Sequence, residues 1–315
     1  MRTAAIDCGT NSIRLLIADI GEDGALTDVV RLMRVVRLGE GVDSTGRLSE
    51  AALARTFAAA EEYAALVEQH GSPAIRFVAT SASRDAENRQ VFVDGIRDRL
   101  GVEPEVITGD EEARLSFAGA VSVREPAEGE TVLVVDLGGG STEFVTGTST
   151  GLVAARSTDM GCVRFTERFL QADPPSDAQI ADMRAEVRRY LVEAADDVPL
   201  RDVTRIVGVA GTVTTVTAHA LGLESYEPDR IHGVELAVTA VTDAASELLH
   251  MTREQRAALP YMHPGRVDVI GAGALIWSCI VERVAELTDG RVSAVITSEH
   301  DILDGIALSV AELRG

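Results

Sequence analysis

Two glycine-containing turns are the part of this chain best suited to chemistry. They read DCGTNS (Asp7–Ser12) and DLGGGS (Asp136–Ser141), and an apolar run precedes and follows each. Glycine lets a phosphate oxygen approach a backbone without a Cβ and permits the positive φ of tight turns, and successive backbone N–H groups can line an anion-binding nest. We therefore predict phosphate binding by these loop residues: Gly9, Thr10, Asn11, Ser12, Gly138, Gly139, Gly140 and Ser141.

Three carboxylates accompany the two turns. Asp7 and Asp136 each begin a turn, and Glu143 follows the second. Oxygen ligands without a histidine or thiolate partner favour Mg²⁺ or Mn²⁺ over Zn²⁺, so we predict that these carboxylates hold such a cation. The alternative is that the aspartates only cap their turns by accepting backbone hydrogen bonds, and that Glu143 is a solvated strand residue.

Two arginines and a third glycine turn add further candidates. In VATSASRDAENR, Arg84 follows a predicted strand and a turn of small residues that includes Ser81, and a guanidinium there can bind two phosphate oxygens. Arg14, on the strand that leaves the first loop, is another candidate. In VGVAGTVTT, Gly211 and Thr212 begin a predicted helix whose N-terminus favours an anion, although close packing of strand on helix explains the glycine equally well.

A glutamate pair, Glu111 and Glu112, begins a predicted helix in TGDEEARL. A carboxylate there is a candidate base for activating water, but composition alone favours an acidic helix start. His232 and His263 occur in loop-like contexts where an imidazolium could contact phosphate. The sequence lacks G-x-S-x-G and G-x-x-x-x-G-K-[ST], which disfavours covalent serine catalysis and P-loop ATP hydrolysis.

The elements that must position these residues follow an α/β pattern. Runs rich in β-branched residues alternate with helical stretches, and the clearest helix spans Ser49 to His70 with Ser49 as N-cap and Gly71 just beyond its end. An internal repeat places AAIDCGTNSIRLLI on LVVDLGGGSTEFVT. We predict strands over residues 3–7, 12–20, 75–80, 104–108, 131–137, 142–148, 205–210 and 292–297.

The repeat and a polar segment predict two domains. REPAEGE at 124–130 separates an N-terminal domain, 1–124, from a second domain, 125–301. An amphipathic C-terminal helix over 302–315, with Ile302, Ile306, Val310 and Leu313 at helical spacing, is expected to pack back on the first domain.

Charge and composition exclude several classes of protein. The 315-residue chain has a formal net charge of −21, which argues against nucleic-acid and anionic-membrane surfaces because both are polyanions. The same field would repel a substrate that carries several phosphate groups, so binding one requires metal ions and a locally basic cleft. The three cysteines lie far apart in sequence, which favours a reducing, cytoplasmic compartment, and no apolar run is long enough for a membrane span.

Five segments together resemble one family. AAIDCGTNSIRLLI, VATSASRDAENR, TGDEEARL, VVDLGGGSTEF and VGVAGTVTT are similar, in this order, to the motifs of the exopolyphosphatase and guanosine pentaphosphate phosphohydrolase family, a branch of the actin and sugar-kinase superfamily. DLGGGS alone fits an actin-like ATPase equally well, whereas TSASRDAEN and GDEEARL favour the phosphatase branch. The resemblance implies two actin-like (ribonuclease H-like) domains related by a pseudo-twofold, with the active site in the cleft between them.

The resemblance also implies roles and a substrate. Glu112 would be the general base, Asp7, Asp136 and Glu143 would hold Mg²⁺, and the glycine loops with Arg84 would bind phosphates. The substrate would be inorganic polyphosphate or guanosine pentaphosphate (pppGpp), an alarmone of the stringent response. Longer relatives carry further helical domains, which implies a preference for shorter polyphosphate here. A homodimer is left open.

Two functions of other classes stay open. The first is an actin-like ATP-binding protein or kinase. Protection by ATP against thermal unfolding, and transfer of the γ-phosphate of ATP to an acceptor, would support it. The second is a non-catalytic sensor of polyphosphate or alarmone, which predicts tight binding without turnover.

Overall fold

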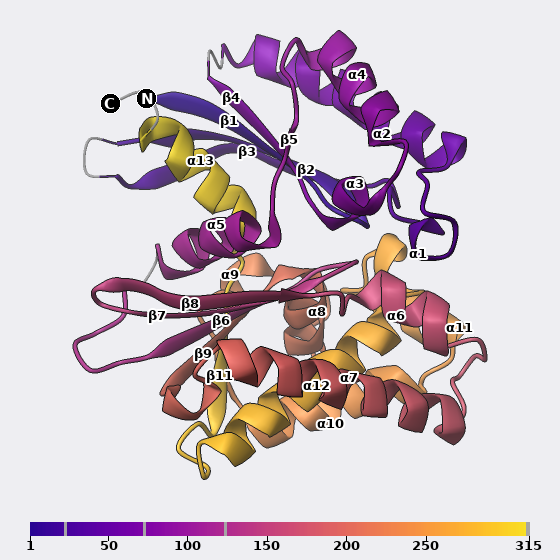
Figure 1. Ribbon diagram of the computed structural model, residues 1–315, viewed down its shortest axis with the longest axis vertical. Coiled ribbons are helices and arrows are strands. Elements are labelled where there is room, and N and C mark those ends of the chain that lie inside the picture. Colours follow the sequence, from indigo (N-terminus) through magenta and orange to yellow (C-terminus); the bar gives the residue numbers. More distant parts are fainter. Residues whose placement is uncertain (22–23, 72–73, 123–124, 313–315) are drawn as a thin grey trace. The chain divides into compact units, whose positions relative to one another are not determined.

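The computed structural model describes residues 1–21, 24–71, 74–122 and 125–312, and residue contacts divide the chain into two units. One unit comprises Met1–Gly119 and Asp301–Gly315, and the other comprises Ala120–His300. Each unit is a sheet covered by helices (Figure 1), so the predicted α/β class is confirmed. The predicted junction at 124–130 lies in part outside the described residues.

The first unit is built on a five-stranded sheet of order β3-β2-β1-β4-β5, in which β1 pairs antiparallel with β2 and parallel with β4. Its strands are β1 (Arg2–Cys8), β2 (Ser12–Ile20), β3 (Leu26–Val35), β4 (Ile75–Ala79) and β5 (Glu105–Val106). Its helices are α1 (Val42–Thr45), α2 (Glu50–Gln69), α3 (Ser81–Asp85), α4 (Arg89–Leu100), α5 (Gly109–Val121) and α13 (Ile302–Glu312).

Alternation along β1 separates the two faces of this sheet. Ala4, Ile6 and Cys8 are buried against α2 and α4, whereas Ala5 packs with α5 and α13. Since side chains alternate along a strand, Asp7 lies on the same face as Ala5. The C-terminal helix α13 buries its apolar stripe on that face, while Leu313 lies outside the described residues.

The predicted helix after residue 49 is confirmed as α2. The Ser49 hydroxyl accepts a hydrogen bond from the Ala52 N–H at 3.2 Å, and Gly71 follows the end of the helix with φ of 61°. Within α2, Tyr63 is fully buried and donates to the Ile13 carbonyl at 2.9 Å, whereas Phe57 is half-buried.

The second unit has a six-stranded sheet of order β10-β11-β9-β6-β7-β8. Its strands are β6 (Val132–Leu137), β7 (Thr142–Thr148), β8 (Gly151–Thr158), β9 (Arg205–Val209), β10 (Glu235–Ala237) and β11 (Ala294–Thr297). Its helices are α6 (Cys162–Phe169), α7 (Asp177–Asp197), α8 (Ala210–Ala220), α9 (Pro228–Ile231), α10 (Val238–His250), α11 (Arg253–Ala257) and α12 (Ile270–Leu287), with short 3₁₀ turns at Leu200–Asp202 and Pro264–Arg266.

The two sheets have the same strand order. When the second sheet is followed from β8 to β11, its order β8-β7-β6-β9-β11 matches β3-β2-β1-β4-β5 of the first. In both, an antiparallel hairpin carries a glycine turn, and the central strand pairs in parallel with the next. The sequence repeat therefore marks a duplicated fold in which equivalent turns end equivalent central strands.

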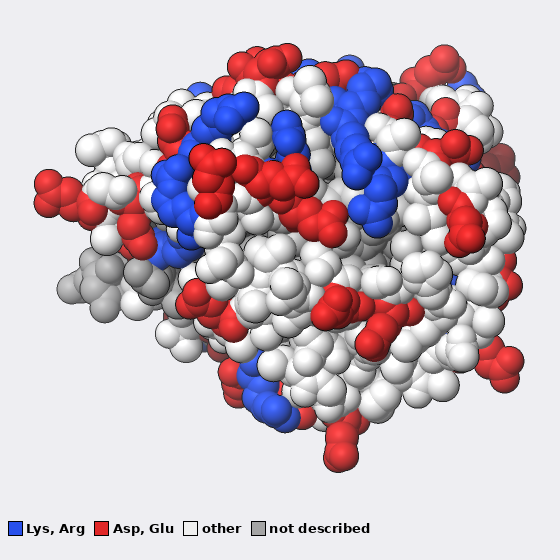
Figure 2. Space-filling view, turned by 90° about the horizontal axis from the view of Figure 1, so that it is seen from below, with Lys and Arg blue, Asp and Glu red and all other residues white. Residues whose placement is uncertain are grey.

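Charged side chains are mixed on the surface. Figure 2 shows arginines beside carboxylates on the face it draws. On α7, for example, Arg189 pairs with Glu186 at 2.6 Å and also with Glu193. In the described part of the chain, no helix is long and apolar enough to cross a membrane.

Candidate active site

The carbonyl groups of the first glycine loop accept hydrogen bonds from the segment that follows β3, which fixes one side of the loop. The Gly9 N–H donates to the Ser12 carbonyl at 2.9 Å and closes the turn between β1 and β2. The Asn11 carbonyl accepts from Val36 and Arg37 at 3.0 and 2.8 Å, and the Thr10 carbonyl accepts from Gly39 at 2.9 Å. In a trans peptide the N–H points opposite to the C=O, so the N–H groups of Asn11 and Ser12 point away from the segment that follows β3.

The second glycine loop is held in the same way by the start of α6. The Gly138 N–H closes the turn on the Ser141 carbonyl at 3.0 Å. The loop carbonyls accept from the α6 segment as follows: Gly138 from the Cys162 N–H at 3.0 Å, Gly139 from the Val163 N–H at 2.8 Å, and Gly140 from Arg164 Nε at 2.8 Å. By the same geometry, the N–H groups of Gly139, Gly140 and Ser141 point away from α6 and form a row suited to an anion.

A positive φ does not explain the glycines of the two loops, although a Cβ on Gly138 would lie 3.2 Å from the Ser141 carbonyl oxygen. None of the predicted loop glycines is among the described residues with positive φ, so that part of the expectation was wrong. A Cβ on Gly161, next to α6, would lie 2.3 Å from the Gly139 carbonyl oxygen. In the first unit, a Cβ on Gly39 would lie 2.3 Å from the Thr10 methyl group, so Gly39 leaves the space in which Thr10 is buried.

An ion-paired chain links Asp7, Arg14 and Asp301 in the first unit. Asp7 is 4% exposed, and its Oδ2 accepts from Arg14 Nε at 2.9 Å and from Nη2 at 2.6 Å. Arg14 Nη1 donates to Asp301 Oδ2. Asp7 Oδ1 is buried and has no hydrogen-bond partner within the described residues. Burial raises the pKa of the Asp7 carboxyl, while Arg14 acts in the opposite direction.

Arg14 can still contact a phosphate. Three of its donor nitrogens are engaged with carboxylates, and a guanidinium carries five N–H groups, so two remain. The phosphate-binding role of Arg14 therefore stays a prediction, with the added observation that Arg14 also holds Asp7.

The equivalent place in the second unit pairs two carboxylates. Asp136 lies opposite Glu143 in the β6–β7 register, as Asp7 lies opposite Arg14 in β1–β2. Asp136 is 7% exposed and Glu143 is 1% exposed, and the Ser157 hydroxyl donates to Glu143 Oε1 at 2.7 Å. Two buried carboxylates on neighbouring strands repel one another unless a cation or a proton lies between them, so this pair suits a divalent cation.

The three predicted metal ligands are divided between the units. Asp7 belongs to the first unit, and Asp136 and Glu143 belong to the second. Among the residues that the structure describes, no group of three histidine, cysteine, aspartate or glutamate side chains forms a metal site. Taken separately, the orphaned Asp7 oxygen in the first unit and the Asp136–Glu143 pair in the second each offer the oxygen ligands that a hard cation prefers.

Glu112 and Arg84 are brought together in the first unit. Glu112 lies in the first turn of α5, is 7% exposed, and accepts from Arg84 Nη1 at 3.1 Å. Arg84 also donates to the Ile107 carbonyl at 3.0 Å, which ties α3 to the segment before α5. Ser81, in the first turn of α3, is 2% exposed, and its hydroxyl has no partner among the described groups. Glu111, by contrast, points to Arg76, which it binds at 2.6 Å.

The third glycine turn has a partner that sequence reasoning missed. A Cβ on Gly211 would lie 2.2 Å from the Arg266 guanidinium, which therefore lies directly on this turn and donates to the Thr215 hydroxyl at 3.1 Å. The preceding residue, Ala210, has a left-handed backbone with φ of 72°, a conformation that is costly for alanine. The sequence offered one local signal for this region: His263 and Pro264, two residues before Arg266, are typical of a loop.

Thr212 and the two loop histidines have neighbours that sequence reasoning did not foresee. The Thr212 side chain lies beside Cys162 and Gly273, and its phosphate-binding role stays a prediction. His263 accepts from the Gly265 N–H at 3.1 Å, and burial, together with Arg266, lowers its pKa, which favours the neutral imidazole. His232 Nδ1 likewise accepts from the Glu299 N–H at 3.1 Å.

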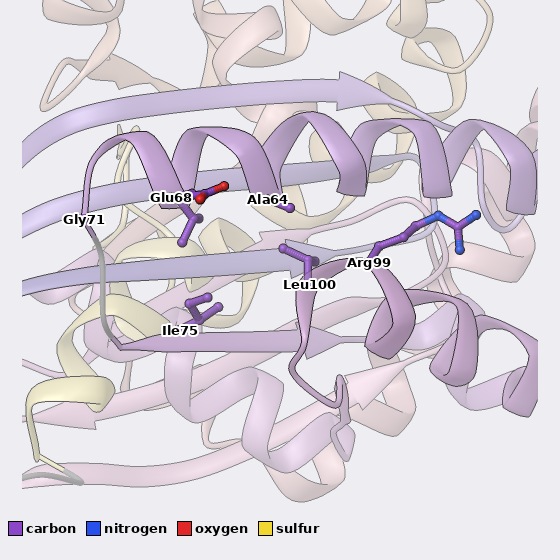
Figure 3. A pocket seen from close by; sticks show the side chains of 7 residues that line it. Ala64, Glu68, Gly71, Ile75, Arg99 and Leu100 are labelled. Carbon is purple, nitrogen blue, oxygen red and sulfur yellow. The ribbon is translucent and has the colours of Figure 1, made fainter.

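In the first unit, a pocket of about 530 Å³ lies near the ends of α2 and α4 (Figure 3). Its lining includes Ala64, Glu68, Ile75, Arg99 and Leu100. It lies on the α2 and α4 face of the first sheet, opposite the face that carries Asp7, and is therefore not part of the candidate site.

A family profile and a curated relative both place this chain among phosphatases. A sequence profile described as the Ppx/GppA phosphatase family matches residues 16–310. The chain is 49% identical over 319 residues to exopolyphosphatase 2 of Mycobacterium tuberculosis (strain ATCC 25618 / H37Rv), with 98% of each chain covered.

Two solved structures are similar over the whole chain. The first, of an exopolyphosphatase-like protein, has a TM-score of 0.95 at 45% identity and covers 100% of this chain and 99% of the other. The second is a Ppx/GppA family member from Aquifex aeolicus, with a TM-score of 0.80 at 30% identity and coverage of 100% and 99%. These neighbours confirm the predicted actin-like, two-domain fold class.

Proposed function

The chain belongs to the Ppx/GppA phosphatase family and is a phosphatase-type hydrolase, and from this premise we propose that it hydrolyses the terminal phosphate of inorganic polyphosphate with the aid of Mg²⁺. The observation that carries the proposal is the shared construction of the two glycine loops. In each, neighbouring segments bind the loop carbonyls and so direct consecutive N–H groups to the other side. Fixed amide dipoles of this kind bind phosphate oxygens without adding cationic side chains.

In this proposal, Glu112 accepts the proton of the attacking water. The Glu112 carboxylate is buried and held by Arg84, so its position is fixed before substrate binds. Water attacks the terminal phosphorus in line with the leaving phosphate oxygen, the P–O bond to the rest of the chain breaks, and inorganic phosphate leaves. The loop amides, Arg84 and Arg266 bind the non-bridging oxygens, on which negative charge is spread in the transition state.

Asp7, Asp136 and Glu143 would hold the cation. A Mg²⁺ ion held there would neutralise charge on the transferring phosphoryl group. The buried Asp7 Oδ1, which lacks a partner among the described residues, and the adjacent carboxylates of Asp136 and Glu143 supply hard oxygen ligands, and Mn²⁺ would suit the same donors. The net charge of −21 supports this requirement, because an uncompensated acidic protein would repel a polyanionic substrate.

Guanosine pentaphosphate is the second candidate substrate of the same site. Its terminal phosphate presents the same chemistry as the end of a polyphosphate chain, so the phosphate groups named above accept either. A kinase or a non-catalytic sensor is less well supported, because a buried, arginine-held Glu112 is suited to activating water.

Release of inorganic phosphate from each substrate tests the proposal. We expect kcat/KM at one Mg²⁺ concentration to be higher for short polyphosphate than for guanosine pentaphosphate or ATP. Within polyphosphate, we expect short oligomers to be turned over better than polymers of hundreds of phosphates. A higher kcat/KM for guanosine pentaphosphate would favour the second candidate, and transfer of the ATP γ-phosphate to an acceptor would reject hydrolysis as the main activity.

A further inference from the structure

A buried carboxylate that sequence reasoning did not single out contacts the candidate metal ligand through Arg14. Asp301 begins the returning segment of the first unit and is 4% exposed. Its Oδ1 accepts from the Leu303 N–H at 3.0 Å and thereby caps α13, which starts at the next residue. Its Oδ2 accepts from Arg14 Nη1.

The Arg14 guanidinium is used in an unusual way. Its Nε and Nη2 both donate to a single oxygen of Asp7, and its third donor nitrogen binds Asp301. An arginine with one carboxylate partner commonly binds both carboxylate oxygens in a bidentate pair. Here the bond to Asp301 holds the guanidinium to one side, and Asp7 Oδ1 stays buried without a hydrogen bond from any described group.

The charge of the Asp7–Arg14–Asp301 cluster also favours cation binding at Asp7. One guanidinium shared by two buried carboxylates leaves the cluster with a net negative charge, which attracts a cation. If Asp301 lost its charge, Arg14 would neutralise Asp7 alone. The attraction of Asp7 for a cation would then fall, and Oδ1 would become open to capture by the guanidinium.

We propose that Asp301 is a positioning residue that, through Arg14, keeps Asp7 Oδ1 available to a divalent cation. This inference rests on the proposed function, in which Asp7 is a metal ligand. Asp301 itself does not touch the cation or the substrate. It orients the ligand Asp7 through Arg14. Loss of a residue that orients a metal ligand commonly weakens metal binding by about 10- to 100-fold.

The chain contains a matched control three residues further on. Asp304 is 1% exposed, accepts from the Asp301 N–H at 3.0 Å, and binds Arg31 Nη2 at 2.6 Å. Arg31 is shared between two carboxylates, as Arg14 is, because it also binds Asp28 at 2.6 Å. Asp304 thus also accepts a backbone hydrogen bond at the start of α13 and pairs with a shared arginine, but its arginine does not bind Asp7.

The test measures binding of Mn²⁺ to the full-length protein without substrate, by the electron paramagnetic resonance signal of free Mn²⁺. We expect Asp301→Asn to raise the Mn²⁺ dissociation constant by about 10- to 100-fold, and Asp304→Asn to leave it unchanged. Asn is about as good an N-cap as Asp at position 301, and at position 304 its side-chain oxygen can still accept from the Asp301 N–H, so both variants should fold, with similar decreases in melting temperature. Asp301→Ser, which also keeps a capping residue, should show the same loss of Mn²⁺ affinity.

Three results would overturn the inference: the first two leave the proposed metal site standing, and the third does not. If Asp7→Asn abolishes Mn²⁺ binding while Asp301→Asn binds as the unaltered protein does, Asp301 has no positioning role and the proposed metal site stands. The same holds if Asp301→Asn and Asp304→Asn weaken binding equally, because the effect is then one of stability. If Asp7→Asn binds Mn²⁺ normally, the metal assignment of the proposed function fails together with the inference.

Discussion

Replacing Glu112 by Gln is expected to lower kcat for phosphate release by about 10²- to 10⁴-fold, because an amide cannot accept the proton of the attacking water. Gln has nearly the shape of Glu and can still accept the hydrogen bond from Arg84, which lies 3.1 Å from Glu112 Oε2. Substrate affinity should therefore change little. Steady-state kinetics of inorganic phosphate release, with substrate binding measured separately by calorimetry, gives both quantities.

Glu111→Gln is the matched control for that experiment. Glu111 is the neighbouring residue on α5, but its carboxylate binds Arg76 at 2.6 Å and is about half exposed. We expect kcat close to that of the unaltered enzyme. Weaker substrate binding in Glu112→Gln with unchanged turnover per bound substrate, or an equal loss of kcat in Glu111→Gln, would reject Glu112 as the base.

Replacing Gly305 by Ala is expected to lower the free energy of unfolding by about 3 kcal/mol or more. A Cβ on Gly305 in α13 would lie 1.9 Å from the Leu115 carbonyl oxygen in α5, and a Cβ on Gly119 in α5 would lie 1.8 Å from the Asp301 carbonyl oxygen. Both obstacles are backbone atoms, so a methyl group at either position forces the two helices apart. Urea denaturation followed by far-ultraviolet circular dichroism measures the effect, since the single tryptophan, Trp277, lies in the other unit.

Gly95→Ala distinguishes a backbone obstacle from a side-chain obstacle. A Cβ on Gly95 in α4 would meet the Phe57 ring at 2.2 Å, but Phe57 is half-buried and can rotate. Alanine also favours a helix over glycine by about 1 kcal/mol, so the net loss of stability should be small. Equal urea midpoints for Gly305→Ala and Gly95→Ala would contradict the close approach of α5 and α13.

The turns, the central strands and the long amphipathic helix could be predicted because local sequence determines them. Apolar runs before and after Asp7 and Asp136 indicated the two hairpins, and the capping residues Ser49 and Gly71 indicated the ends of α2. Strands β3, β8 and β10 were missed. Strand β3 carries several charged residues and lies at the edge of its sheet, and β10 has only three residues. Neither therefore shows the apolar run of a central strand.

The partners of the site residues could not be predicted, because they come from distant parts of the chain. Asp301 lies 287 positions from Arg14, and Arg266 lies 51 positions from Thr215. The role of Gly39 depends on the methyl group of Thr10, and the buried orientation of Thr212 depends on Gly273 and Cys162. Such contacts arise from packing of the folded chain and leave no local pattern.

Hydrolysis of a polyphosphate of defined length in ¹⁸O-labelled water, with products identified by mass spectrometry, tests the central claim most directly. Attack of water on the terminal phosphorus predicts inorganic phosphate that carries one ¹⁸O atom and a polymer that is one phosphate shorter and unlabelled. Label in the shortened polymer, or fragments produced by cleavage within the chain, would contradict it.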